Sequence, residues 1–65
     1  MARQLTDTER QEFLIDLDEA ADDVEVTSWE AGFIESNMDR EHFSDAQRAV
    51  IDKMVDRYGR EIGWE

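Results

Sequence analysis

Apolar residues recur at helical spacing in three separate segments of this chain. The three sets are Phe13, Leu14, Leu17, Ala21 and Val24; Trp29, Phe33, Ile34 and Met38; and Val50, Ile51, Met54, Val55 and Tyr58. Recurrence every three or four residues places each set along one side of a helix. The pattern therefore predicts three amphipathic helices, with the most regular stripe in the third.

Each predicted helix begins at a capping box, in which Ser or Thr is followed three residues later by Glu or Gln. In this motif the hydroxyl accepts the N–H of the third helical residue, and the side chain of that residue accepts the N–H of the cap. The boxes begin at Thr6, Thr27 and Ser44. They predict helices at 7–21 or slightly beyond, 28–38 and 45–58, joined by connections at 22–26 and 39–43.

Two glycines have predicted structural roles. Gly59 directly follows the third helix and is expected to be its left-handed C-cap. Gly32 lies in the middle of the second helix, where glycine costs about 1 kcal/mol relative to alanine. We therefore expect Gly32 to allow the close approach of a neighbouring helix. Beyond Gly59, Ile62 and Trp64 supply apolar groups that can fold back onto the helices.

These elements predict an all-α fold, a compact three-helix bundle in which a helical hairpin at residues 27–58 is packed by an N-terminal helix. Short connections favour antiparallel neighbours. The 65 residues contain no proline and form one acidic domain, 1–65. A chain of this length buries only about 60% of the surface that its unfolded form exposes. We therefore expect a small stability margin.

Charge excludes several classes of function. Eighteen Asp and Glu against seven Lys and Arg give a net charge of −11, which should repel nucleic acid and anionic lipid. The third helix and its end carry Arg48, Lys53, Arg57 and Arg60, but also Asp45, Asp52, Asp56 and Glu61. A helix that reads DNA should be far more basic. A helix–turn–helix role is therefore disfavoured.

The chain offers little for catalysis or for metal binding. It contains no cysteine and one histidine, His42, which lies in a predicted surface turn. No nucleophile–histidine pairing or His-based metal site can be assembled from these residues. With no apolar stretch of 18 residues and no signal-peptide pattern, we expect a cytoplasmic protein. We predict a protein that is not an enzyme and needs no cofactor.

An acid-rich run at residues 16–25 is the main candidate site. Its carboxylates are Asp16, Asp18, Glu19, Asp22, Asp23 and Glu25. A calcium loop starting at Asp16 would need glycine at its sixth position and glutamate at its twelfth, where this chain has Ala21 and Thr27. The run is therefore either a solvated helix face or an acidic surface that docks a basic partner.

Ile15 interrupts the polar face of the first helix. Its helical neighbours are Glu12, Asp18, Glu19 and Asp22. A single exposed aliphatic residue is ordinary, but an apolar side chain among carboxylates also suits contact with a positively charged protein surface. The predicted partner-binding residues are Glu12, Ile15, Asp16, Asp18, Glu19, Asp22, Asp23 and Glu25.

The two C-terminal helices pair the pattern Thr27-x-Trp29-Glu30-x-x-Phe33-Ile34-x-Ser36 with Ser44-x-x-Gln47-x-x-Val50-Ile51. This pairing, which covers about half of the chain, resembles a segment of small, mostly uncharacterised bacteriophage and prophage proteins. Similar segments usually place a basic residue just before the glutamine, where this chain has Ala46. The resemblance implies a phage origin and a bacterial host, and it implies no activity.

The favoured hypothesis is a phage-type protein that binds and inhibits a host or defence protein. Its acidic face would act like a polyanion and occupy a basic, nucleic-acid-binding surface. The alternative is a structural or assembly module, or a homodimeric adaptor without inhibitory activity. A homodimer through the second helix or the C-terminal tail is favoured by the many large apolar residues, Trp29, Phe33, Ile34, Met38, Phe43 and Trp64.

Overall fold

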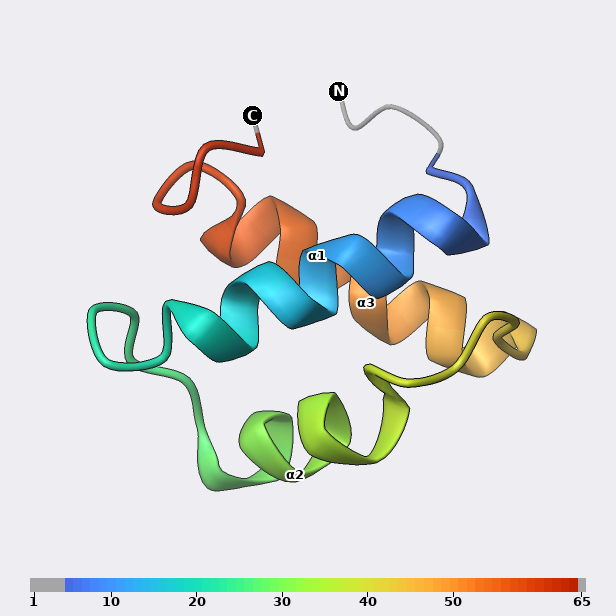
Figure 1. The fold of residues 1–65 in the computed structure, drawn as a ribbon, viewed down its shortest axis with the longest axis horizontal. Helices are drawn as coiled ribbons and strands as arrows, with labels where there is room; N and C mark the ends of the chain where they lie inside the picture. Colours follow the sequence, from blue (N-terminus) through green and yellow to red (C-terminus); the bar gives the residue numbers. More distant parts are fainter. Residues whose placement is uncertain (1–4, 65) are drawn as a thin grey trace.

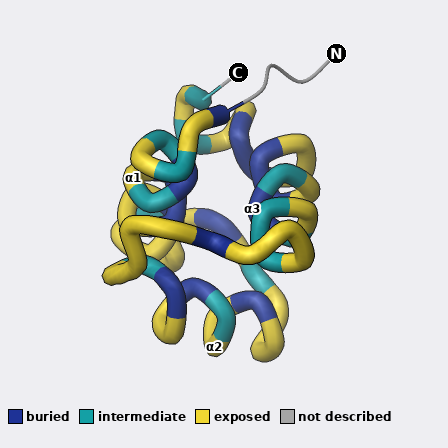
Figure 2. Tube along the Cα trace, turned by 90° about the vertical axis from the view of Figure 1, so that its right-hand side faces the viewer, coloured by how far each residue is buried: buried dark blue, intermediate teal, exposed yellow. Residues whose placement is uncertain are grey.

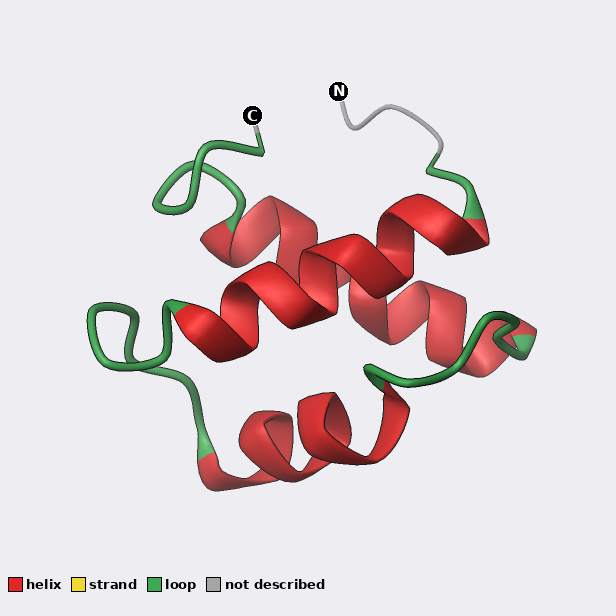
Figure 3. Ribbon diagram, viewed as in Figure 1, coloured by secondary structure: helices red, strands yellow, loops and turns green. Residues whose placement is uncertain are grey.

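The computed structural model describes residues 5–64, which form three α-helices and no strand (Figures 1 and 3). The helices are α1, Asp7–Glu19; α2, Ser28–Asn37; and α3, Asp45–Tyr58. The predicted all-α, three-helix bundle is confirmed. The bounds of α3 are those predicted from the sequence, and α2 ends one residue earlier, with Met38 as its C-cap.

All three predicted capping boxes are formed. In α1, the Glu9 N–H donates to Thr6 Oγ1 at 3.1 Å, and the Thr6 N–H donates to Glu9 Oε1 at 3.0 Å. The same reciprocal pair of bonds starts α2 at Thr27 and α3 at Ser44. Each box supplies two hydrogen bonds that a helix start otherwise lacks. The first turn of every helix is therefore stabilised locally.

Helix α1 ends at Glu19, two residues before its predicted end. Ala20 is its C-cap, and its carbonyl then accepts from the N–H groups of Asp23 and Val24 in a tight turn. The turn carries Val24 back to the core, where it is 4% exposed. Val24 is therefore a core residue, as its place in the apolar stripe suggested, but it lies outside the helix.

Helix α1 is the common packing partner of the other two helices (Figure 1). No Cα atom of α2 lies within 8 Å of a Cα atom of α3. Side chains bridge this gap: the Tyr58 hydroxyl donates to Glu30 at 2.6 Å, and the Gln47 amide donates to Asn37 at 3.1 Å. The two arms of the predicted hairpin are thus held together largely through α1.

The core lies on the inner faces of the three helices (Figure 2). Its buried apolar residues are Leu5, Phe13, Leu14, Leu17, Val24, Ile34, Phe43, Ile51, Met54, Val55 and Tyr58. The C-terminal tail folds back as anticipated, with the Trp64 ring packed edge-on against Phe13 at 5.5 Å between centroids. Aromatic pairs favour this T-shaped geometry because the positive edge of one ring meets the negative face of the other.

The expectations for two glycines are wrong. Gly59 has φ −56° and continues the right-handed turn, whereas Gly63, with φ 83°, is the left-handed residue. The Trp64 N–H then donates to the Gly59 carbonyl at 2.7 Å, in the manner of a Schellman ending. This extra turn directs Trp64 towards the core.

Gly32 does not mediate close helix packing. A Cβ atom built at this position would have no heavy atom within 4 Å apart from the local chain. The residue is exposed on the outer side of α2. Its cost to helix stability is therefore not offset by a close contact within the bundle.

Candidate functional site

All eight predicted partner-binding residues are exposed. Helix α1 presents Glu12, Ile15, Asp16, Asp18 and Glu19, and the following connection presents Asp22, Asp23 and Glu25. The side of α1 that carries Phe13, Leu14 and Leu17 is completely buried, which leaves the acidic side in solvent. Ile15 is 39% exposed and lies on that side, as the periodicity predicted. Whether these residues bind a partner stays a prediction.

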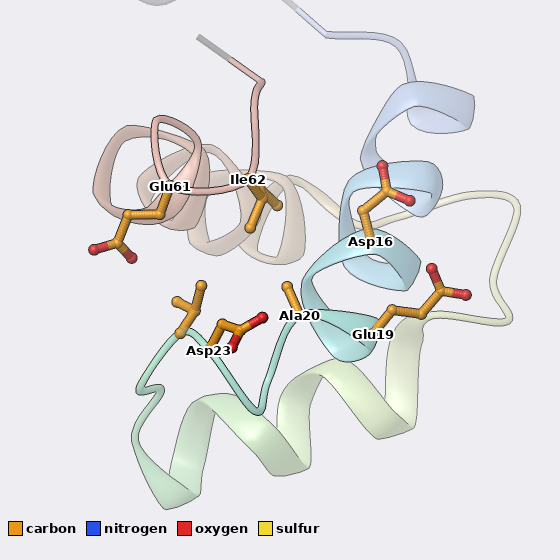
Figure 4. A pocket seen from close by; sticks show the side chains of 7 residues that line it. Asp16, Glu19, Ala20, Asp23, Glu61 and Ile62 are labelled. Carbon is orange, nitrogen blue, oxygen red and sulfur yellow. The ribbon is translucent and has the colours of Figure 1, made fainter.

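A hollow of about 360 Å³ lies at one edge of this acidic region, between the end of α1, the turn that follows it and the C-terminal tail (Figure 4). Its lining residues are Asp16, Glu19, Ala20, Asp23, Val24, Glu61 and Ile62. The side chain of Ile62 points into the space between the tail and α1, whereas Glu19 and Glu61 point outwards on opposite sides (Figure 4). An apolar surface is thus bordered by carboxylates.

Glu61 is a site residue that sequence reasoning missed. It reaches the hollow only because the tail turns back after Tyr58, and the other carboxylates of the hollow, Asp16, Glu19 and Asp23, lie about 40 residues away in the chain. No local motif around Glu61 indicates this position. From here on, "acidic surface" means the eight predicted residues together with Glu61.

The carboxylates of the acidic surface are separated rather than convergent. Within residues 5–64, no group of three or more Asp, Glu, His or Cys side chains is placed to hold a metal ion. Asp16 accepts a hydrogen bond from the Trp64 indole at 3.0 Å. The other carboxylates of the surface make no hydrogen bond or ion pair with any described residue. The arrangement is suited to several cationic side chains of a partner rather than to one ion.

Three arginines, in contrast, are paired with carboxylates, and one of them is buried. Arg10 is 5% exposed and joins Asp52 and Asp7, with its Nε and Nη1 atoms each 3.0 Å from a carboxylate oxygen. Arg48 donates to Asp7 Oδ2 at 2.9 Å. Arg48 therefore ties Asp7 at the start of α1 to α3, and Arg10 of α1 reaches α3 through Asp52. Asp7 also accepts the Phe43 N–H at 3.3 Å.

These contacts keep Asp7 ionised. The hydrogen bond from Arg48 lowers its pKa most; burial acts in the opposite direction, and the Phe43 N–H and Arg10 lower it further. The resulting pKa lies far below the ordinary value of 3.8. Because each paired arginine is matched by a carboxylate, the excess negative charge of the protein falls on the remaining acidic residues.

Glu30 forms a second polar centre, between α2 and α3. It is 7% exposed and accepts hydrogen bonds from the Tyr58 hydroxyl, the Thr27 N–H and Arg57. Burial raises the pKa of Glu30, but the bonds from Tyr58 and Thr27 and the charge of Arg57 together bring it below its usual value. The bond to Glu30 in turn raises the pKa of Tyr58. The capping role of Glu30 was predictable, but its contact with Tyr58 was not.

The basic residues of α3 do not form a continuous cationic strip. Arg48 pairs with Asp7 and Asp45, and Arg57 pairs with Glu30 at 3.3 Å. His42 is in the connection between α2 and α3, where its side chain is 91% exposed and lies 4.0 Å from Asp7. Lys53 is the third basic residue of α3; it is exposed and makes no ion pair with a described residue, and one such cation is few for the phosphates of nucleic acid.

Among residues 5–64, no helix combines the length and the apolar composition needed to cross a membrane. Comparison of the chain with protein-family models, with curated proteins and with solved structures gave no match. The candidate function therefore depends on the geometry and charge of the chain's own residues.

Proposed function

We propose that this protein is not an enzyme and acts by binding a partner protein that has a basic surface. The observation that carries the proposal is the contrast between two groups of charges. Three arginines, the buried Arg10 and the more exposed Arg48 and Arg57, are paired with carboxylates, while the carboxylates of the acidic surface are exposed and largely unpaired. A surface of this kind attracts a basic protein and repels nucleic acid.

Charge and apolar contact would have different roles in such a complex. At physiological salt the Debye length is about 8 Å, so the exposed carboxylates act on a partner mainly during its final approach. They increase the association rate and orient the partner. Once docked, Ile15 and the apolar part of the hollow supply area that leaves water. The hollow can also receive the aliphatic stem of a lysine or arginine, whose charge then meets Glu19, Asp23 or Glu61.

The proposed consequence is inhibition. A basic surface that normally binds phosphates would be covered by this protein, and nucleic acid would be excluded from it. The phage-like segment at residues 27–58 supports a setting in the cytoplasm of a bacterial host, where the partner would be a host or defence protein.

The test is charge reversal with a matched control. The partner is first captured from bacterial lysate and purified, and its binding is then measured at several salt concentrations. The triple change Asp18→Lys, Glu19→Lys and Asp22→Lys alters the net charge by +6 and removes no core contact. The control triple, Glu35→Lys, Asp39→Lys and Glu41→Lys, alters the charge equally at exposed positions of α2 and its following turn.

We expect the first triple to weaken binding at least tenfold, mainly through slower association, and the control to have a much smaller effect. Duplex DNA should compete with the protein for the partner. Binding that is insensitive to salt and survives the first triple would contradict the proposal.

An assembly module or a homodimer is the alternative, and the exposure of Trp29 favours it. This side chain is 63% exposed, the largest value among the big apolar residues of the described chain. In that case neither triple charge reversal should change the assembly, whereas Trp29→Ala should disrupt it. Sedimentation of the wild-type protein and of this variant at high concentration distinguishes the two functions.

A further inference from the structure

A hollow of about 330 Å³ between α2 and α3 shares no residue with the acidic surface. Its lining residues are Thr27, Trp29, Glu30, Val50, Lys53, Met54 and Arg57. It exists because the backbones of α2 and α3 stay apart, while side-chain bridges hold the two helices at either end, Glu30 to Tyr58 and Asn37 to Gln47. We call it the α2–α3 groove.

The apolar part of the groove is well positioned for binding. Trp29 stacks on Phe33 with ring centroids 5.4 Å apart and planes inclined by 22°, so its ring is supported by a neighbouring side chain. Val50 is half-buried and Met54 is buried beneath the groove. A supported, exposed tryptophan beside an apolar depression is typical of residues that dominate binding energy in protein interfaces. A partner side chain placed there would cover much of the indole.

The charge of the groove is opposite to that of the rest of the protein. Lys53 is exposed and makes no ion pair with any described residue. Arg57 is 65% exposed and contacts Glu30 with one Nη atom. The carboxylate of Glu30 already accepts from Tyr58 and Thr27. Two cations thus accompany one satisfied carboxylate, in a chain whose net charge is −11.

We infer that the α2–α3 groove binds a short acidic segment of a partner protein, one that carries large apolar side chains next to a carboxylate. The apolar side chain lies against Trp29, Val50 and Met54, and the carboxylate pairs with Lys53. Charge complementarity selects this occupant: a lysine-rich segment would meet Lys53 and Arg57, and it would be drawn instead to the acidic surface. A second copy of the chain would bring another eleven negative charges. This interaction is separate from the proposed binding of a basic partner.

The experiment uses two peptides that differ only in charge, acetyl-Glu-Leu-Leu-Glu-amide and acetyl-Lys-Leu-Leu-Lys-amide. Each is titrated to millimolar concentration into the ¹⁵N-labelled protein, and the Trp29 indole and the amides of Lys53 and Met54 are followed by NMR. The glutamate peptide should shift these signals in a saturable manner. The lysine peptide should instead shift signals of the acidic surface. If only the net charge of the protein mattered, the lysine peptide would bind at the groove more tightly than the glutamate peptide.

Lys53→Glu and Arg60→Glu form a matched pair, because both lower the net charge by 2 and both residues are exposed. Lys53→Glu should weaken the affinity of the groove for the glutamate peptide by about fivefold, equivalent to about 1 kcal/mol. Arg60→Glu should change this affinity by less than about twofold, equivalent to about 0.4 kcal/mol.

Three results would overturn the inference. The first is that the glutamate peptide leaves the NMR signals of Trp29 and Lys53 unshifted. The second is that the lysine peptide shifts the groove signals as much as the glutamate peptide does. The third is that the protein sediments as a dimer with Trp29 buried in its interface.

Discussion

The hydrogen bond between Tyr58 and Glu30 is expected to be one of the most important polar contacts for stability. The two residues lie 28 positions apart in the chain, and both are 7% exposed. The hydroxyl–carboxylate distance of 2.6 Å is in the range of charge-assisted hydrogen bonds. This contact connects the first turn of α2 to the last turn of α3, where the two backbones do not meet.

Replacing Tyr58 with Phe removes one donor and leaves the ring in place. The buried carboxylate then loses a partner that water cannot fully replace, and hydrogen bonds to charged groups contribute about 1.5–3 kcal/mol. We expect a loss of about 2 kcal/mol in the free energy of unfolding. In a domain of this size 1 kcal/mol corresponds to about 4–8 °C, so the melting temperature should fall by about 8–16 °C.

The assay is thermal and urea unfolding followed by circular dichroism at 222 nm, on Tyr58→Phe, Glu30→Gln and the double variant. The double-mutant cycle should give a coupling energy of about 1–2 kcal/mol. Glu35→Gln is the matched control, because Glu35 is an exposed glutamate of the same helix whose side chain makes no hydrogen bond with a described residue. It should change stability by less than about 0.5 kcal/mol.

The pH dependence has a defined sign. The pKa of Glu30 is lower in the folded protein than its ordinary value of 4.5. Its contribution to stability is therefore complete above that value and is lost as the pH falls through the lower, folded pKa. Glu30→Gln should reduce the acid sensitivity in this window. A Tyr58→Phe variant as stable as the wild type, or a Glu35→Gln variant that loses as much stability as Glu30→Gln, would contradict this role of the Tyr58–Glu30 bond.

Three further predictions concern charge and one glycine. Raising NaCl from about 20 mM to about 300 mM at pH 7 should raise the melting temperature, because salt screens repulsion among eleven excess negative charges; a decrease would contradict this. Asp7→Asn should lower the melting temperature, because Arg10 and Arg48 lose their shared anion. Since the pKa of Asp7 lies below 3.8, the difference from the wild type should shrink as the pH falls below that value. Gly32→Ala should raise the free energy of unfolding in urea by about 0.5–1 kcal/mol, because the added methyl meets open space; a loss would reveal an intermolecular contact on that face.

The starts of the helices were readable from the sequence because their stabilising contacts are local. A capping box joins residues three apart, so Thr6–Glu9, Thr27–Glu30 and Ser44–Gln47 could each be recognised without knowing the fold. The buried side of α1 and the exposure of Ile15 likewise follow from helical periodicity. Five exposed residues of the acidic surface lie on α1, whereas Asp22, Asp23 and Glu25 were identified from the acid-rich run that continues into the connection.

The ends of α1 and of the C-terminal turn depended on tertiary packing. Helix α1 stops at Glu19 because Val24 reaches the core by a turn rather than by more helix. The left-handed residue is Gly63 instead of Gly59, because an additional turn allows Trp64 to pack on Phe13. In both places a local preference yields to burial of a large apolar side chain.

The pairing of distant charges was decided by tertiary structure alone. Arg10 donates to Asp52, 42 residues away in the chain, and Asp16 accepts from the Trp64 indole, 48 residues away. Tertiary structure likewise places Glu61 at the acidic hollow and Lys53 in the same groove as Trp29. Periodicity tells which side of a helix is polar, but it carries no information about which polar side of another helix will face it. That choice follows from how three short helices bury one shared core.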